Sequence, residues 1–403
     1  MLENKRDILS FIILIVYVLG GFLGIGVWMF FIPLCLFFLI KLSHCGFTES
    51  TFHDFCPMDY CVLAVCVSEI LSCAFSVNIP NSIKASAPIV VVAFFWLFIR
   101  IIGISKNNLY SIITGGSYLA LFFSLITVVS FIRFKSDFSA YGSSITNFKQ
   151  EYTPMNMPVN DWVSFLLCLL PYPFVSACLS ENKLKRFLHA GISALLTLSV
   201  VLSLSRGAYI ALAVFYMVSF IYFIVFEKGR KRKCIGILAV SGFFSLLLAI
   251  PANKEVITTC TMSSTTSQRM SNDGRVQLLE ESISLWKDKP MTGAGAGNFN
   301  IVYDSCVVDR KASSTRATNV YALILVEKGI VGILAYCGLA IAVLICFLVK
   351  RSASGLPFFF ACFAALCVRG LFFSSMFDYK AVLMLVMLVL LILTMDIDEA
   401  VEQ

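Results

Sequence analysis

The stretch from Ala208 to Phe226 reads AYIALAVFYMVSFIYFIVF and contains no charged residue. About 20 consecutive apolar residues are enough for an α-helix to cross a hydrocarbon layer of roughly 30 Å. This stretch therefore predicts a transmembrane helix, and similar stretches recur from Ile8 almost to the C-terminus. The 403-residue chain is 59% hydrophobic and 14% charged, which excludes a single soluble core. The sequence predicts an all-α polytopic membrane protein.

We expect about twelve transmembrane helices, because the chain contains that many apolar stretches of sufficient length. The first two are short and interrupted by glycines, so they form either two spans or one irregular hairpin. The expected spans are Ile8 to Phe22, Gly24 to Ile40, Tyr60 to Val77, Ala85 to Ile102, Leu109 to Phe131, Trp162 to Leu179, Ala190 to Leu204, Ala208 to Phe226, Cys234 to Ile250, Val320 to Val349, Leu356 to Met376 and Ala381 to Met395.

Lysine and arginine gather in alternate short loops, and such loops stay cytoplasmic. The dense clusters lie at 100–106, 183–186, 228–233 and 350–351. This pattern predicts that both termini are cytoplasmic and that the two longer loops, 133–161 and 251–319, face the opposite side. The chain then has three parts: an N-terminal bundle of about nine helices (1–250), a large outer loop (251–319) and C-terminal transmembrane helices (320–403).

The large outer loop contains one segment with helical periodicity. Residues Arg275 to Trp286 read RVQLLEESISLW, and their apolar residues follow helical spacing. Asp273 and Gly274 stand where a helix start is expected, and Pro290 stands where the helix must end. The sequence predicts an amphipathic helix that lies either on the membrane surface or against the helical bundle.

The cysteine content, the net charge and the histidines bear on disulfides, nucleic-acid binding and metal sites. Most of the 15 cysteines lie in apolar runs, where cysteine acts as a small hydrophobic residue. Cys260 and Cys306 are the two in the large loop and either pair or stay reduced. The net charge of +7 is explained by topology rather than by nucleic-acid binding. His44, His53 and His189 lie in or beside predicted cytoplasmic segments, so we expect no metal site on the outer face.

Three arginines are candidates for binding an anion at the outer face. Arg206, in Ser205-Arg206-Gly207, occupies the short break between two spans, and Arg369 falls inside an apolar span. Arginine in a membrane is costly unless an anion compensates it. With Arg275, these residues supply guanidinium groups suited to phosphate. The alternatives are that Arg206 only reaches lipid headgroups and that Arg369 forms a structural ion pair with Asp378 or Glu327.

A glycine-rich run, KPMTGAGAGNF from Lys289 to Phe299, follows the predicted loop helix. Glycine allows a backbone to approach a phosphate closely, but the strand and helix of a dinucleotide site are missing. The run also lacks the Lys-Ser/Thr ending of a P-loop. A nucleotide-binding fold is disfavoured, and a tight turn is the simpler interpretation.

The order of these motifs resembles the O-antigen ligase and O-antigen polymerase superfamily. Ser205 to Tyr209 (SRGAY) resembles the superfamily's motif at a span junction. Arg275 to Phe299 resembles the start of its large periplasmic loop, with Arg, Trp and Pro followed by GxGxGNF. Thr318 to Leu323 (TNVYAL) and Glu327 to Gly332 (EKGIVG) resemble the end of that loop, usually His-Asn-x-Tyr-Leu and then E-x-G-x-x-G. The topology agrees over the chain, and the motifs run chiefly from Ser205 to Gly332.

The resemblance implies a C-type glycosyltransferase fold that needs no metal and no cofactor. It implies an enzyme at the periplasmic face of the bacterial inner membrane, whose donor is a glycan on undecaprenyl diphosphate. The acceptor would be a sugar hydroxyl on a growing glycan or on lipid A-core. Arg206 and Arg275 would bind the diphosphate and stabilise its leaving charge. We add Arg369 from its position, and the remaining motif residues as substrate-binding candidates: Gly293, Gly295, Gly297, Asn319 and Glu327.

Thr318 departs from the superfamily pattern, because ligases carry there the histidine proposed to activate the acceptor hydroxyl. A threonine hydroxyl is not a useful base near neutral pH. Either Asp304, Asp309 or Glu327 replaces the histidine, or the base is dispensable, or the protein is not a ligase. Polymerases of the superfamily depend less on that histidine, so Thr318 favours a polymerase.

Three functions follow from these observations. The first is polymerisation of lipid-linked repeat units of O-antigen or a similar surface polysaccharide, and the second is ligation of the glycan to lipid A-core. The third, from a different class, is transport of a lipid-linked sugar. Transporters usually show paired halves and interrupted helices near the midplane, and the sequence shows no internal symmetry. The late, unpaired outer loop favours an enzyme.

Overall fold

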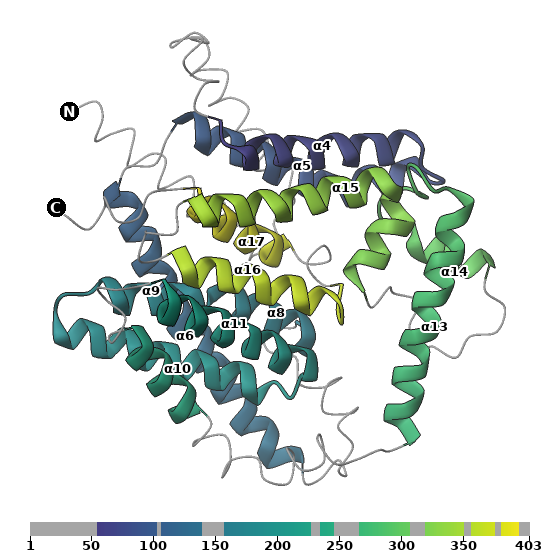
Figure 1. Ribbon diagram of the computed structural model, residues 1–403. Coiled ribbons are helices and arrows are strands. Elements are labelled where there is room, and N and C mark those ends of the chain that lie inside the picture. Colours follow the sequence, from purple (N-terminus) through teal and green to yellow (C-terminus); the bar gives the residue numbers. More distant parts are fainter. Residues whose placement is uncertain are drawn as a thin grey trace. The chain divides into compact units, whose positions relative to one another are not determined.

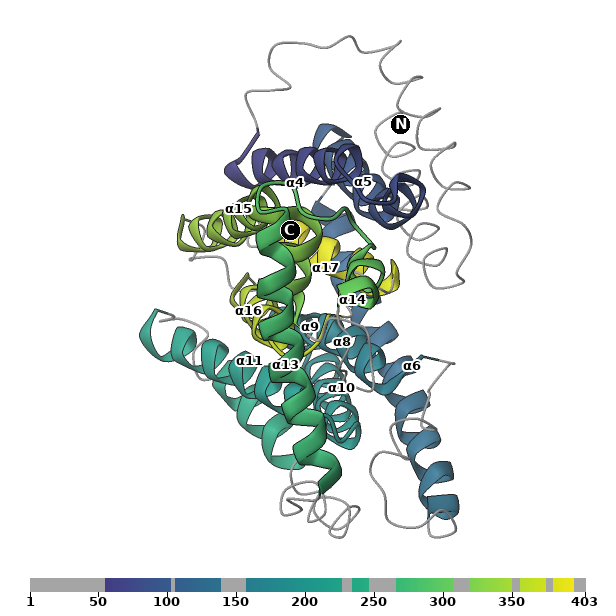
Figure 2. The same ribbon diagram turned by 90° about the vertical axis from the view of Figure 1, so that its right-hand side faces the viewer.

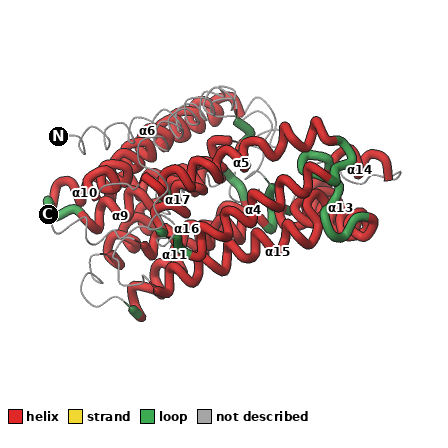
Figure 3. Tube along the Cα trace, turned by 90° about the horizontal axis from the view of Figure 1, so that it is seen from above, coloured by secondary structure: helices red, strands yellow, loops and turns green. Residues whose placement is uncertain are grey.

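The computed structural model describes residues 55–102, 106–138, 157–226, 234–245, 266–306, 319–349, 356–374 and 380–394. Every regular element in these ranges is an α-helix (Figure 1). The trace in Figure 3 accordingly shows helices and loops, and no strand, in the described part of the chain. The predicted all-α class is confirmed.

The chain divides into two compact units. Unit 1 comprises residues 1–108, 266–349 and 377–394, and unit 2 comprises 109–265, 350–376 and 395–403. The described helices of unit 1 are α4 (Pro57–Ala74), α5 (Ile79–Ile102), α13 (Thr266–Asp288), α14 (Phe299–Cys306), α15 (Val320–Val349) and α17 (Lys380–Leu393). Those of unit 2 are α6 (Lys106–Phe138, from Leu109 on), α8 (Val159–Leu169), α9 (Pro171–Leu179), α10 (Lys183–Leu202), α11 (Arg206–Val225), a helix at Cys234–Ser245 and α16 (Leu356–Gly370).

Seven helical segments in the described residues are long and apolar enough to cross a membrane. They are Pro57–Ala74, Ile79–Leu97, Leu109–Arg133, Val159–Leu179, Lys183–Leu202, Arg206–Val225 and Val320–Val349. Each corresponds to a span expected from the sequence, whereas the total of about twelve is not confirmed. The first two expected spans, 8–22 and 24–40, lie outside the described residues. The three-part division of the chain rests on membrane topology and stays a prediction.

The span expected from Trp162 to Leu179 consists of two helices. Leu170 separates α8 from α9, and α9 begins at Pro171, where the missing proline N–H costs no helical hydrogen bond. The apolar segment is buried continuously from Asp161 to Leu179, unlike the six others. Trp162 and Phe165 pack against the ring of Phe123 on α6, at centroid distances of 5.7 and 4.9 Å. This segment is the core of unit 2.

The span expected from Val320 to Val349 is broken at Gly329. The backbone there has φ 62° and ψ −159°, which interrupts α15 between Lys328 and Ile330. The sequence conceals this kink, because Glu327 and Lys328 before the glycine are good helix formers and the residues after it are apolar. In unit 1, α15 runs beside α4 over much of its length (Figure 1).

The predicted loop helix exists as α13, but its expected start is wrong. It begins at Thr266 rather than at Asp273 and continues through Gly274. Gln268, Arg269 and Met270 are good helix formers and precede Asp273, and this Asp-Gly pair lies within a helix and not before one. The expected end before Pro290 is confirmed, since α13 stops at Asp288.

One face of α13 packs against other helices of unit 1. Leu278 and Leu285 form a hydrophobic cluster with Phe299 and Tyr303 of α14 and Val326 of α15. Figure 2 shows α13 ending beside α15. The helix therefore lies against other helices of the protein through this face.

Candidate functional site

The predicted break between two spans at Ser205-Arg206-Gly207 is confirmed in unit 2. Helix α10 ends at Leu202, and α11 begins at Arg206. Leu204 has φ 55°, the one positive value among the described residues other than glycine. This tight connection makes Arg206 the first residue of α11, where its side chain is exposed.

Arg369 lies buried beneath this junction, with 2% of its surface exposed. Its Nε donates to Ser164 Oγ at 2.8 Å, and its Nη2 donates to the carbonyl of Asn160 at 2.6 Å. Its Nη1 donates to Ser205 Oγ at 3.5 Å, and Ser205 Oγ donates in turn to Asn160 Oδ1 at 3.0 Å. The guanidinium thus links α8 and α16 to the residue before Arg206.

Arg369, which the sequence places inside an apolar span, is buried in the protein. Of the two alternative ion-pair partners, Asp378 lies outside the described residues. The other, Glu327, accepts from Phe299 and Ser72 within unit 1, and its pairing with Arg369 stays open. The hydrogen bonds to Ser164, Ser205 and Asn160 indicate that Arg369 holds the junction in place.

Gly207 allows α16 and the segment that follows it to approach α11 closely. A Cβ at this position would lie 3.2 Å from Phe372 Cβ and 3.4 Å from Arg369 Nη1. The three residues of the Ser-Arg-Gly motif therefore play different parts. Ser205 accepts from Arg369, Gly207 permits close packing, and Arg206 is presented outward.

Replacing Arg369 by methionine is expected to lower the free energy of unfolding by about 3 kcal/mol. The change leaves buried oxygens of Ser164, Ser205 and Asn160 without their donor. Unfolding of the purified protein in detergent measures the effect. Arg186→Met is the matched control, because half-exposed Arg186 also donates to a carbonyl, that of Ser180 at 3.0 Å, and should cost less than about 1 kcal/mol. Equal losses in both variants would contradict the assigned role.

The glycine-rich run forms a turn that pairs with the kink of α15 in unit 1. Gly293, Gly295 and Gly297 have φ values of 71°, 99° and 72°, which favour glycine. The N–H groups of Ala294 and Gly295 donate to the carbonyls of Val326 and Glu327, both at 2.8 Å. In return, the N–H groups of Ile330 and Val331 donate to the carbonyls of Pro290 and Met291, at 2.9 and 3.2 Å.

The other side of the run packs on the connection between α4 and α5. Asn298 Nδ2 donates to Ser76 Oγ at 2.7 Å and to Ser82 Oγ at 3.0 Å. Asn81 Nδ2 donates to the carbonyl of Gly297 at 2.7 Å. A Cβ at Gly295 would collide with Ser76 and Ser82. These contacts support the interpretation as a tight turn, since the backbone groups bind protein partners.

Two other candidate residues, Asn319 and Glu327, make hydrogen bonds within the protein. Asn319 caps α15, because its Oδ1 accepts from the N–H groups of Tyr321 at 2.8 Å and Ala322 at 3.2 Å. Glu327 is buried, and its Oε1 accepts from the N–H of Phe299 at 3.2 Å. Arg275 is half-buried on α13. The remaining residues are Asp304, which is exposed on α14, and Thr318 and Asp309, which lie outside the described residues.

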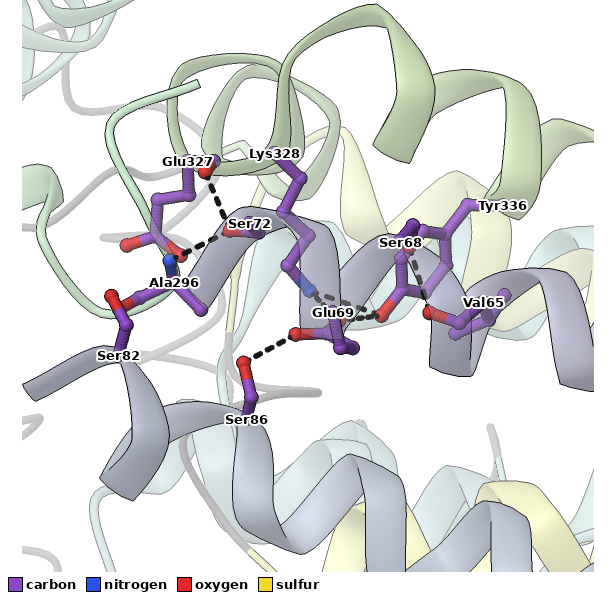
Figure 4. Close-up of polar contacts among 10 residues, drawn as sticks. All are labelled: Val65, Ser68, Glu69, Ser72, Ser82, Ser86, Ala296, Glu327, Lys328 and Tyr336. Carbon is purple, nitrogen blue, oxygen red and sulfur yellow. Dashed lines mark hydrogen bonds and ion pairs between the residues drawn. The ribbon is translucent and has the colours of Figure 1, made fainter. Parts of the chain in front are cut away.

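Sequence reasoning missed a buried ionic network between α4, α5 and α15 (Figure 4). Lys328 Nζ forms an ion pair with Glu69 Oε1, and both side chains are almost completely buried. Ser86 Oγ donates to Glu69 Oε2 at 2.7 Å, and Tyr336 OH donates to Oε1 at 2.9 Å. The sequence did contain a signal for it: Glu69 lies in the span expected from Tyr60 to Val77. An ionisable residue inside a membrane span usually marks a functional site.

Cysteine and histidine add no metal centre in the described part of the chain. The cysteines described there are free thiols, most of them buried or half-buried, as expected of small hydrophobic residues. Cys260 and the side chain of Cys306 lie outside the description, so their pairing stays open. No group of three potential metal ligands occurs among the described residues. His189 is buried, with Nδ1 2.8 Å from Ser117 Oγ.

The segment that contains most of these features also matches a known family. Residues 191–337 match the family model described as O-antigen ligase. The resemblance to the O-antigen ligase and polymerase superfamily is thereby confirmed. The matched segment includes Arg206, Arg275, the glycine-rich run and the kink at Gly329. A search of curated proteins finds no match.

The O-antigen ligase match and the apolar helices together support a coarse description of the protein. The seven candidate spans indicate a membrane protein, and the family suggests a glycosyltransferase-like enzyme. The same family implies a lipid-linked glycan and an acceptor as substrates in general. Glu69 and Arg369 lie outside the matched segment, although both contact residues within it.

Proposed function

We propose that this protein is a bacterial inner-membrane glycosyltransferase with its large loop in the periplasm. It transfers a glycan from undecaprenyl diphosphate to an acceptor sugar, and it joins repeat units of O-antigen or a similar surface polysaccharide. The observation that carries the proposal is the exposed Arg206 at the start of α11, within the segment that matches the O-antigen ligase family. Its neighbour Ser205 accepts a hydrogen bond from Arg369, and its neighbour Gly207 packs closely against Phe372.

Arg206 has the chemistry that a diphosphate leaving group requires. Its planar guanidinium binds two phosphate oxygens at once, and the positive end of the α11 dipole adds to the attraction. When the acceptor hydroxyl attacks the anomeric carbon, the bond from that carbon to the phosphate oxygen breaks and charge grows on the diphosphate. Arg206 and Arg275 each stabilise that charge, so the transfer needs no metal and no cofactor.

We assign the remaining motif residues to positioning. Arg369 fixes the junction that presents Arg206, through Ser164, Ser205 and the carbonyl of Asn160. Gly293, Gly295, Gly297 and Glu327 build the turn that connects α13 to α15, and Asn319 caps α15. They serve substrate binding by fixing the loop that carries Arg275.

Thr318 favours a polymerase over a ligase within this proposal, because the ligase histidine is replaced. Proton removal from the acceptor is then left to a carboxylate. Of the two candidates that the structure describes, Asp304 is exposed and Glu327 is buried. The ligase remains the second candidate, since the matched family is described as O-antigen ligase. A transporter of lipid-linked sugars is the alternative from another class.

The glycan profile of a deletion strain tests the proposal. A polymerase mutant caps the lipid A-core with a single repeat unit, whereas a ligase mutant leaves the core bare and accumulates long glycan on the carrier lipid. Purified protein supplied with lipid-linked repeat units should lengthen them without an energy source. Movement of intact lipid-linked sugar across vesicle membranes, without glycan transfer, would contradict the enzyme and support the transporter.

Restoring histidine at Thr318 tests the missing base. General-base catalysis typically contributes about 10²- to 10⁴-fold, so a site that retains ligase chemistry should gain rate in Thr318→His. For a polymerase with another base, we expect a change in kcat of less than about 3-fold. Turnover of the purified variant with lipid-linked donor and each acceptor class gives the answer. A large gain with lipid A-core alone would favour the ligase.

A further inference from the structure

The buried network of unit 1 consists of one carboxylate and three donors. Glu69 of α4 pairs with Lys328, and Ser86 and Tyr336 donate to its two oxygens at 2.7 and 2.9 Å. Lys328 Nζ also donates to Tyr336 OH at 3.1 Å. A buried ion pair contributes little net stability, but its partners hold one discrete geometry, because separating them leaves a buried charge. Such a pair is suited to fixing a position.

The position that it fixes is the kink of α15. Lys328 directly precedes Gly329, and the carbonyl of Glu327 accepts from Ser72 Oγ at 3.0 Å. Ser72 lies one turn after Glu69 on α4, and its Oγ accepts from the N–H of Ala296 at 3.0 Å. Figure 4 shows both contacts on the same stretch of α4. Helix α4 therefore holds the kink and the glycine-rich run together.

The kink in turn determines where α13 lies. Residues Pro290 to Gly295 pair with the backbone on both sides of Gly329, and Leu278 and Leu285 of α13 pack on Val326. Arg275 precedes Asp288, the last residue of α13, by 13 residues, or about 20 Å along an α-helix. A rotation of about 6° at the end of α13 would move Arg275 by about 2 Å over that length. Displacements of about 1 Å can cost about 10²-fold in rate.

We infer that Glu69 and Lys328 form a positioning pair that holds Arg275 in place for the diphosphate of the lipid-linked donor. This inference rests on the proposed function. Neither residue needs to touch the substrate, because both are buried and engaged with each other. They act through the kink, the glycine-rich run and α13, all of which belong to unit 1.

The first test is Lys328→Met in purified protein, with an undecaprenyl-diphosphate-linked repeat unit as donor. We expect kcat to fall about 30-fold and the donor KM to change less than about 3-fold, because Arg275 acts chiefly on charge that develops in the transition state. Reversing the pair, with Glu69→Lys and Lys328→Glu together, should restore most of kcat. If the single variant does not fold, Glu69→Met with Lys328→Met replaces the pair by apolar groups and should fold with the same loss of kcat.

Arg100→Met is the matched control, because Arg100 pairs with Asp59 of α4 at 3.1 Å in the same unit. It removes a cation that also pairs with α4, but from α5 rather than from α15 and its kink. The buried Asp59 keeps its hydrogen bonds from Trp96 Nε1 at 2.7 Å and from the N–H of Cys56 at 2.8 Å. Because Arg100 and Lys328 pair with different carboxylates, kcat should stay within about 3-fold of the wild type. A fall as large as that of Lys328→Met would show a general loss of packing and overturn the inference.

A double-mutant cycle with Arg275→Lys separates the inference from the proposed function. If Lys328 acts through Arg275, Lys328→Met should lower kcat less than about 3-fold in the Arg275→Lys background. The same factor of about 30 in both backgrounds, with Arg275→Ala inactive, would overturn the positioning role alone. Wild-type activity in Arg275→Ala would remove the role of Arg275 in the proposed function, and the inference with it.

Discussion

Arg206→Ala is expected to abolish glycan transfer while the protein still inserts into the membrane and purifies at its normal yield. The side chain is exposed at the start of α11, so its removal exposes no core and leaves Ser205 and Gly207 in place. Loss of one group that stabilises a developing anion costs about 10²- to 10³-fold, and a diphosphate concentrates more charge than a single oxyanion. Transfer from a lipid-linked donor by the purified variant measures the effect.

Two further variants sharpen this prediction. Arg206→Lys should recover only part of the rate, because an ammonium group lacks the planar fork that binds two oxygens. Lys183→Ala is the matched control, since Lys183 is the exposed first residue of α10 in the same unit, as Arg206 is of α11. It should retain full activity. Full activity in Arg206→Ala would contradict the assignment of this arginine to the donor.

Gly329→Ala is expected to prevent accumulation of folded protein. The φ of 62° with ψ of −159° is essentially restricted to glycine. A Cβ there would also collide with the backbone of Met291 and Thr292, which cannot move without breaking the pairing between the turn and α15. Together these effects cost more than about 4 kcal/mol, a large part of the stability of a domain. Size-exclusion chromatography of the expressed variant measures the outcome.

The control for this glycine lies in the interior of a regular helix. A Cβ at Gly191 of α10 would meet no other atom within 4 Å, so Gly191→Ala should be neutral or stabilising by about 1 kcal/mol. A Gly329→Ala protein that is folded and as stable as Gly191→Ala would refute the kink as described.

The sequence predicts the spans well because a hydrocarbon layer demands long, apolar, internally hydrogen-bonded helices. The bounds expected for Val320 to Val349 agree with α15, and those for Ala208 to Phe226 agree closely with α11. The kink inside α15 was missed because its partners come from elsewhere in the chain. Only the pairing with Pro290 to Gly295 and the hydroxyl of Ser72 reveals that Gly329 interrupts the helix.

In the candidate site, too, residues of short motifs could be predicted from the sequence, whereas their distant partners could not. Arg206 and Arg275 are visible in the sequence because each belongs to a short motif. The partners of Arg369 are not, since Asn160 and Ser164 lie about 200 residues away and carry no motif. Glu69 is the one charged residue in the span expected from Tyr60 to Val77. Its structural role cannot be predicted locally, because its partner Lys328 lies 259 residues later.

The pairing at the kink has a consequence for engineering chimaeras. Val326 and Glu327 accept backbone hydrogen bonds from the loop that precedes α15, and Ile330 and Val331 donate to it, so the start of α15 as far as Val331 folds with that loop. A graft of this loop from a relative that ends at Asn319 would divide one folding module. A graft that extends to Val331 and brings matching residues at Ser72, Ser76, Asn81 and Ser82 keeps the module whole.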